Sequence, residues 1–103
     1  MKIAFYGSSL LSAYWNGAAT YYRGMLRALS EKGYDITFYE PDVYDRQKNR
    51  DIEPPDWCKV VVYEGTVDAL KHVAQKAGDA DIVVKASGVG FEDDLLLDQV
   101  LRA

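Results

Sequence analysis

Four short apolar runs recur along the chain, separated by longer stretches of mixed character. The runs are rich in β-branched and aromatic residues, and they cover 2–7, 35–40, 59–64 and 81–87. None of them alternates cleanly between polar and apolar positions, which is typical of parallel strands covered on both faces. The pattern therefore predicts four buried β-strands.

Two stretches between these strands carry apolar residues at intervals of three and four, which predicts helices over 17–32 and 67–77. Asn16 precedes the first helix and Thr66 precedes the second, and both residue types are favoured N-caps. A glycine follows each helix, as is common where a helix ends. These flanking residues predict where each helix begins and ends.

A third helix is predicted to begin near Glu92 and to run to the C-terminus, because the acidic residues that follow favour the positive end of the helix dipole. The resulting order is β-α-β-β-α-β-α. A strand, a helix and a parallel strand form a right-handed crossover unit. The sequence therefore predicts one α/β domain over 1–103, with a Rossmann-like parallel four-stranded sheet, strand order 3-2-1-4 and helices on both faces.

Charge and the rare residue types narrow the range of partners. The net charge is -4 and the 12 basic residues are scattered among 16 acidic ones, which argues against a nucleic-acid-binding surface. No apolar run approaches the roughly 20 residues of a membrane span. Cys58 and His72 are single residues of their types, so we expect no intrachain disulfide and no metal site. We expect no cofactor either. A lone cysteine fits a cytoplasmic location, with Cys58 buried and His72 solvated.

The loop after the first strand is the first candidate binding element. Ligands of open α/β sheets lie beyond the carboxyl ends of the strands, and the N–H groups at the start of the next helix can hold a phosphate. Gly7 and Ser8 open this loop, Gly17 allows close approach to the backbone, and Asn16 and Thr20 offer polar side chains. The alternative is that Asn16 and Gly17 only cap the helix.

Better-known phosphate motifs are absent from this loop. A dinucleotide fingerprint needs G-x-G-x-x-G directly after the strand, and the glycines at 7, 17 and 24 do not have that spacing. Glu40 ends the second strand, where an acid can bind a ribose, although it can equally face solvent. The sequence therefore does not predict a dinucleotide cofactor.

Aromatic residues cluster beside the same loop. Tyr14 and Trp15 are candidates for stacking on a sugar or a base, whereas Tyr21 and Tyr22 have the helical spacing of core residues. The connection over 41–57 is long for a compact domain and carries three basic and five acidic residues. We interpret it as a solvated rim, with a binding element as the alternative.

The stretch MKIAFYGSSLL…NGAATYYRGMLRALSEKGYDITFYEP resembles the start of GT-B glycosyltransferases, particularly the large retaining families. In these families a strand, a glycine-bearing loop and a helix precede a second strand, and Gly17, Ala18, Leu29 and Gly33 match the helix pattern. The likeness covers roughly residues 1–40, whereas 60–103 agrees only in topology.

The resemblance implies the acceptor-side, N-terminal lobe of a longer two-lobe enzyme that transfers a sugar from a nucleotide-sugar donor to an acceptor. It also implies that the loop after the fourth strand lines the acceptor site, which makes Lys85, Ser87 and Gly88 candidate contacts; the alternative is a plain turn into the last helix. A lysine that ends an apolar strand either reaches solvent or meets an anion. Because the other lobe carries the main donor contacts, the isolated chain is expected to be inactive. The competing hypothesis is a stand-alone nucleotide- or anion-binding module without catalysis.

The predicted strand order leaves the fourth strand at an edge of the sheet. The apolar residues at 82–84 do not include the charges or prolines that usually protect such an edge. The last helix also carries more apolar residues than one small sheet can bury: Leu95, Leu96, Leu97, Val100 and Leu101. We therefore predict that the chain forms a homodimer, through the edge or through the helix.

Overall fold

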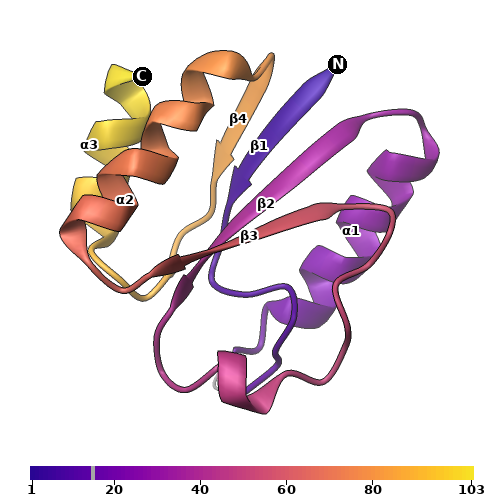
Figure 1. Cartoon of the computed structure of the whole chain (residues 1–103). Helices are drawn as coiled ribbons and strands as arrows, with labels where there is room; N and C mark the ends of the chain where they lie inside the picture. The colour runs from indigo at the N-terminus through magenta and orange to yellow at the C-terminus, as the bar shows by residue number, and fades with distance from the viewer. Residues whose placement is uncertain (15) are drawn as a thin grey trace.

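A computed structural model describes residues 1–14 and 16–103 and confirms the α/β fold. The described residues form four strands and three α-helices, with two short 3-10 helices, η1 and η2 (Figure 1). In chain order the elements are β1 (Lys2–Tyr6), α1 (Ala19–Glu31), β2 (Asp35–Asp42), η1 (Gln47–Asn49), β3 (Lys59–Glu64), α2 (Val67–Ala74), η2 (Gln75–Asp79), β4 (Ile82–Lys85) and α3 (Asp93–Arg102).

The sheet has the order β3-β2-β1-β4, and every neighbouring pair is parallel. This confirms the predicted arrangement. All four strands therefore run in the same direction, so their carboxyl ends meet at one edge of the sheet (Figure 1). The loops that follow β1, β2 and β4 all begin at this edge.

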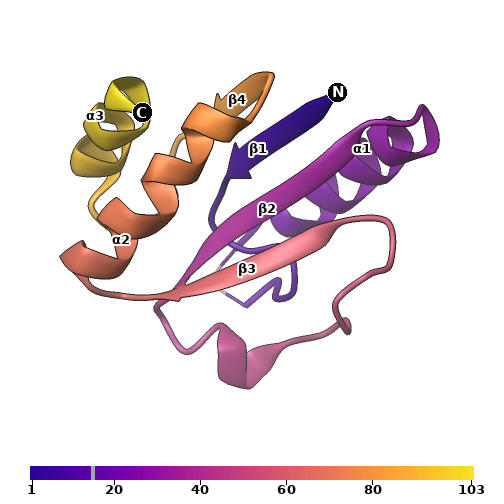
Figure 2. The same cartoon turned by 45° about the horizontal axis from the view of Figure 1, so that its top comes forward.

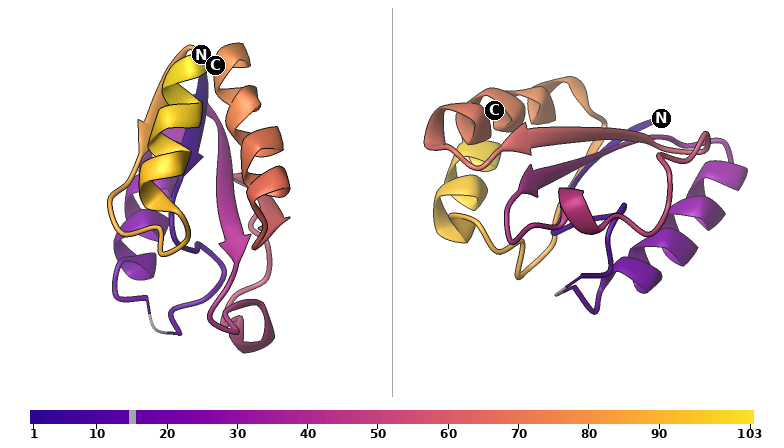
Figure 3. Two further views of the ribbon diagram at one scale, coloured as in Figure 1. Left: turned by 90° about the vertical axis from the view of Figure 1, so that its left-hand side faces the viewer. Right: turned by 60° about the horizontal axis from the view of Figure 1, so that its bottom comes forward.

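Two apolar cores cover the two faces of the sheet, because successive side chains of a strand point to opposite faces. On one face, Phe5 and Phe38 pack with the buried side of α1. On the other face, Tyr6 and Tyr39 pack with residues of α2 and α3. Figures 2 and 3 show α1 separated from the α2–α3 pair by the sheet.

Helix α1 begins at Ala19, two residues later than predicted, and its N-cap is Ala18. The prediction that Asn16 caps this helix is wrong, because no side chain makes a capping hydrogen bond there. The helix ends as expected: Gly33 has a φ of +95°, a conformation that glycine adopts without the steric penalty of a Cβ atom.

The remaining helix ends agree more closely with the sequence. The Thr66 hydroxyl accepts a hydrogen bond from the Ala69 N–H at 3.2 Å, which confirms its role as the N-cap of α2. Helix α2 then tightens into η2 rather than continuing as an α-helix, and α3 begins directly after Glu92. His72 is exposed and Cys58 is buried, both as predicted.

Within the described residues, none of the helices combines the length and the apolar character that crossing a membrane requires.

Candidate functional site

The loop after β1, residues 7–18, folds inward at its start. Gly7 lies so close to the core that a Cβ atom there would be 2.5 Å from Cζ of Phe38. Ser8, Ser9 and Leu10 follow and are almost completely buried. The beginning of the loop is therefore part of the protein interior and is not open to a ligand.

Glu40, the last but two residue of β2, holds this buried part of the loop in place. Its side chain is fully buried, so the expectation that it can face solvent is wrong. The carboxylate accepts hydrogen bonds from the Ser9 hydroxyl at 2.7 Å and from the Leu10 N–H at 2.9 Å. The Gln47 amide donates to it as well, at 2.7 Å. Glu40 thus satisfies donors from two loops and does not present an acid for a ribose.

The Asn16 side chain closes the same loop upon itself. Its Oδ1 accepts a hydrogen bond from the Ser8 hydroxyl at 2.7 Å, and its Nδ2 donates to the carbonyl groups of Ser9 and Ser12 at 2.8 and 2.9 Å. All three polar positions of the amide are used inside the protein. Asn16 and Ser8 are therefore structural residues, and neither offers a free polar atom to a ligand.

The end of the loop is different, because the first turn of α1 faces solvent. Gly17 and Thr20 are exposed, and a Cβ atom at Gly17 would meet no other atom within 4 Å. The Ala19 N–H donates to the Asn16 carbonyl, whereas the N–H groups of Thr20 and Tyr21 have no hydrogen-bond partner within the described residues. An uncapped helix start of this kind carries partial positive charge and attracts anions.

The loop after β4, residues 86–92, is shaped by Asp93. Its carboxylate accepts hydrogen bonds from Lys85 Nζ at 2.9 Å, from the Val89 N–H at 2.8 Å and from the Gly90 N–H at 3.2 Å. Burial alone would raise the pKa of Asp93, but the hydrogen bonds from Lys85 and the two N–H groups outweigh it and hold the pKa below its ordinary value. The charge on Asp93 is thus stabilised by the loop that it organises.

Lys85 is consequently engaged in the fold. Its side chain is only 12% exposed and forms an ion pair with Asp93, so it neither reaches solvent nor remains available to an anion. Ser87 and Gly88, by contrast, are exposed at the tip of the turn, and Gly88 has a φ of +70°. Of the predicted contacts in this loop, these two residues are the ones that a ligand can reach.

A groove of about 650 Å³ runs between α1 and β4. Apolar side chains such as Phe5, Met25 and Val84 line most of it, and it ends between Ala18 and Ser87. The structure therefore brings the start of α1 and the turn after β4 to the same end of one groove. Of the predicted contacts, it leaves accessible Gly17, Thr20, Ser87 and Gly88, and it draws into the protein Gly7, Ser8, Asn16 and Lys85.

The predicted aromatic contacts divide in a similar way. Tyr14 is 43% exposed beside the loop, as stacking on a ligand would require. The prediction for Trp15 falls on a residue outside the described part of the chain. Tyr22 is buried against Phe5, as expected, but Tyr21 is 68% exposed, so its assignment to the core is wrong.

The long connection, residues 43–58, braces the loop after β1. The Asp51 N–H donates to the Leu11 carbonyl at 3.0 Å, and the Ser12 hydroxyl donates to the Asn49 carbonyl at 2.8 Å. Arg23 of α1 binds the Asp51 carboxylate with two nitrogens, at 2.6 and 3.0 Å, and this lowers the pKa of Asp51. The connection is charged and largely exposed, as expected of a rim, and it also fixes the start of α1.

The roles of Glu40 and Asp93 could not be predicted directly from the sequence, because each depends on residues that only the fold brings together. A weak signal existed for Asp93, since Val89 and Gly90 lie four and three residues before it, a spacing at which an Asp side chain can accept N–H groups of a turn.

Comparison with known proteins adds no relative: no protein-family model, curated protein or solved structure matches this chain. Within the described residues there is also no group of three or more His, Cys, Asp and Glu side chains that could hold a metal ion.

Proposed function

We propose that the chain is the acceptor-side lobe of a GT-B type glycosyltransferase and contributes a phosphate-facing helix start to a site completed by a second lobe. The observation that carries the proposal is the uncapped N-terminus of α1 beside the exposed turn at Ser87 and Gly88. Both lie at the carboxyl edge of a parallel sheet, where ligands of this class of fold bind. The resemblance of residues 1–40 to that enzyme class suggests the reaction, which is the transfer of a sugar from a nucleotide-sugar donor.

Local polarity supports the proposal more than overall charge does. The chain is acidic, with a net charge of -4, so it does not attract anions as a whole. The first turn of α1 contains no acidic residue, and the N–H groups of Thr20 and Tyr21 have no partner among the described residues. A diphosphate placed there would accept hydrogen bonds from these groups and interact favourably with the helix dipole.

In such an enzyme this lobe positions the reactants and contributes a phosphate contact, while the second lobe supplies the main contacts to the donor. Sugar transfer accelerates when the acceptor and the donor phosphates are held in attack geometry between two lobes. The α1–β4 groove, which ends at Ser87, offers an apolar surface for the acceptor next to the exposed helix start. The chain by itself is therefore expected to bind but not to transfer.

The test is a titration of the chain with uridine diphosphate, followed by amide NMR shifts and by calorimetry. We expect the Thr20 and Tyr21 amides to shift, and Gly17→Val to weaken binding by roughly tenfold or more, because a branched side chain blocks approach to the helix start. The fold should tolerate the valine, since a Cβ atom at Gly17 points into open space.

Gly24→Val is the matched control, because Gly24 lies on the same helix and a Cβ atom there also meets open space. This variant should bind uridine diphosphate as the unchanged chain does. Equal affinity of the Gly17→Val variant would contradict the proposal. Binding of inorganic pyrophosphate as tight as that of uridine diphosphate would instead favour the stand-alone anion-binding module.

A further inference from the structure

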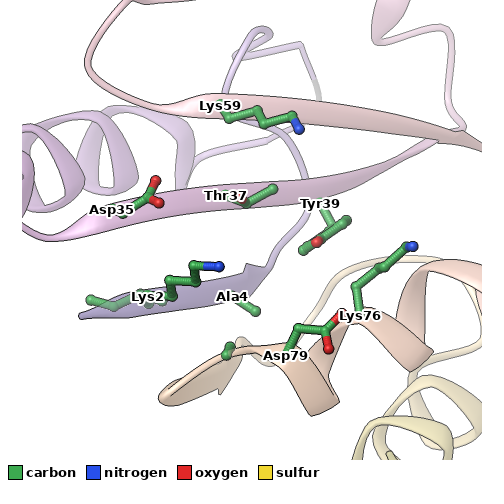
Figure 4. Close-up of a pocket in the computed structure, with 10 residues that line it drawn as sticks. Lys2, Ala4, Asp35, Thr37, Tyr39, Lys59, Lys76 and Asp79 are labelled. Atoms are coloured by element: carbon green, nitrogen blue, oxygen red, sulfur yellow. The ribbon is translucent and has the colours of Figure 1, made fainter.

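A second hollow lies at the opposite end of the sheet, on the face that carries α2. It has a volume of about 320 Å³ and opens between η2 and the amino-terminal halves of β1, β2 and β3 (Figure 4). Ala4 and Thr37 form its floor, with Lys2, Lys59 and Lys76 around it. We call this cavity the lysine hollow.

Strand register explains why these side chains gather. Ala4 pairs with Thr37, and Thr37 pairs with Lys59, so the three residues follow one another across neighbouring strands. Lys2 precedes Ala4 by two residues and therefore points to the same face. The small side chains of Ala4 and Thr37 leave the space above the sheet open, and the longer lysine side chains border it.

The charged groups of the hollow are not neutralised by one another at close range. In the part of the chain that the structure describes, no ion pair within 4.0 Å includes Lys2, Lys59 or Lys76. The two acidic residues of the lining, Asp35 and Asp79, form no such pair either. Three ammonium groups thus surround one hollow of a chain that is acidic overall.

Two hydroxyl groups complete the lining. Thr37 and Tyr39 both border the hollow (Figure 4). Neither hydroxyl has a hydrogen-bond partner among the described residues. Burial and, after it, the Asp79 carboxylate raise the pKa of Tyr39 above its ordinary value, so this hydroxyl remains protonated and can donate. The hollow therefore offers hydrogen-bond donors of two kinds, charged ammonium groups and neutral hydroxyl groups.

We infer that the lysine hollow binds a small phosphorylated sugar or polyol. Phosphate oxygens accept charge-assisted hydrogen bonds from lysine ammonium groups. The carboxylates of Asp35 and Asp79 accept hydrogen bonds from hydroxyl groups, which a polyol has and inorganic phosphate does not. The volume lies at the lower end of the range for small-molecule sites, about 300–1,000 Å³, which suits a monosaccharide phosphate. This site is at the opposite edge from the start of α1, so it is independent of the proposed function.

The probe is glucose 6-phosphate, added to the 15N-labelled chain, with glucose and inorganic phosphate as comparisons. We expect saturable amide shifts at Thr37, Tyr39 and Lys59, tighter binding than for inorganic phosphate, and no saturable response to glucose. Lys59→Gln should raise the dissociation constant roughly tenfold, because it removes one ammonium contact. Thr37→Val should raise it by a smaller factor while it keeps the shape of the side chain.

Lys48→Gln is the matched control: Lys48 is an exposed lysine of η1, at the carboxyl edge, and its loss removes the same charge. If the Lys48→Gln variant binds glucose 6-phosphate with an affinity within twofold of that of the unchanged chain, the result supports a specific site. An equal loss for Lys48→Gln and Lys59→Gln, or shifts confined to the start of α1, would overturn the inference.

A lipid headgroup can present the same phosphate chemistry, so vesicles that contain phosphatidic acid form a second arm. Flotation of the chain with these vesicles, without any response to glucose 6-phosphate, would overturn the assignment to a soluble ligand. A response to glucose 6-phosphate that Lys59→Gln weakens would support it.

Discussion

The carboxylate of Glu40 and the hydroxyl of Ser9 form a hydrogen bond of 2.7 Å in the interior of the protein. The bond joins the end of β2 to the loop after β1, across 31 positions of the chain. The same carboxylate accepts the N–H groups of Leu10 and, at 3.4 Å, Leu11. One acidic side chain therefore fixes the path of a loop that has no regular secondary structure.

Replacing Glu40 with glutamine should lower the free energy of unfolding by about 2–3 kcal/mol. The change removes a charged acceptor and turns an amide NH2 group toward donors that are themselves buried. Urea denaturation measures the difference. Glu64→Gln is the control, since Glu64 also ends a strand but is exposed, and it should change stability by no more than about 0.5 kcal/mol. Similar losses in both variants would contradict a special role for Glu40.

Removing the hydroxyl groups of two buried tyrosines should have opposite effects on stability. The Tyr6 hydroxyl donates to the Val73 carbonyl at 2.8 Å, whereas the buried Tyr63 hydroxyl has no hydrogen-bond partner within the described residues. We expect Tyr6→Phe to destabilise the protein by about 1 kcal/mol, and Tyr63→Phe to leave stability unchanged or to increase it by up to about 1 kcal/mol. Thermal and urea unfolding of both variants tests this, and a larger loss for Tyr63→Phe would show that its hydroxyl is hydrogen-bonded in solution.

Acid should weaken the hydrogen bonds and the ion pair through which Asp93 stabilises the loop after β4. The folded protein lowers the pKa of Asp93, so the stabilisation is fully present above the ordinary carboxyl pKa, 3.8, and is lost as the pH falls below it through the folded value. The difference in unfolding free energy between the unchanged chain and Asp93→Asn should therefore shrink between pH 5 and pH 2. The change should be about 1 kcal/mol or less, because the Asp93 side chain is 36% exposed. A difference that does not vary with pH would contradict this account.

Self-association of the chain remains a prediction, and the structure identifies the exposed residues whose substitution tests it. The edge strand β4 leaves Ile82, Val83 and Val84 between 36% and 40% exposed, and Leu101 of α3 is 75% exposed. Light scattering at micromolar concentration should report a dimer, and Val83→Lys should shift it toward the monomer if pairing uses the β4 edge. Leu101→Lys tests the alternative through α3, and Val67→Lys, at an exposed valine of α2, is the control. If light scattering reports a monomer of the unchanged chain across a tenfold dilution series, the prediction is wrong.

The sequence predicted the elements whose signals are local. The strand order followed from crossover rules, and Thr66 and Gly33 act where the sequence places them, because an N-cap and a left-handed C-terminal residue depend on their immediate neighbours. Asn16 has the same N-cap chemistry but a different role. Its amide is used by the carbonyl groups and the hydroxyl of its own loop, so the helix begins after it without a cap.

The candidate site was less predictable for the same reason. In the sequence, Lys85 is simply the last residue of an apolar strand. Its ion pair with Asp93 depends on the turn after β4, which brings Asp93 close to it. The residues of the lysine hollow lie far apart along the chain, and strand register alone brings Lys59 beside Thr37. Long-range pairing of this kind leaves no periodic trace that a single sequence can reveal.

The bond between Glu40 and the Leu10 N–H has a consequence for the dynamics of the chain. This amide is buried and its acceptor belongs to a central strand, so its hydrogen can exchange with solvent only when β2 separates from the loop. Irregular loops usually exchange within the least stable part of a protein, and sheet centres within the most stable part. We therefore expect the start of this loop to open together with β1 and β2 as one cooperative unit, so an anion bound at the exposed end of the loop would lie beside a slowly exchanging segment.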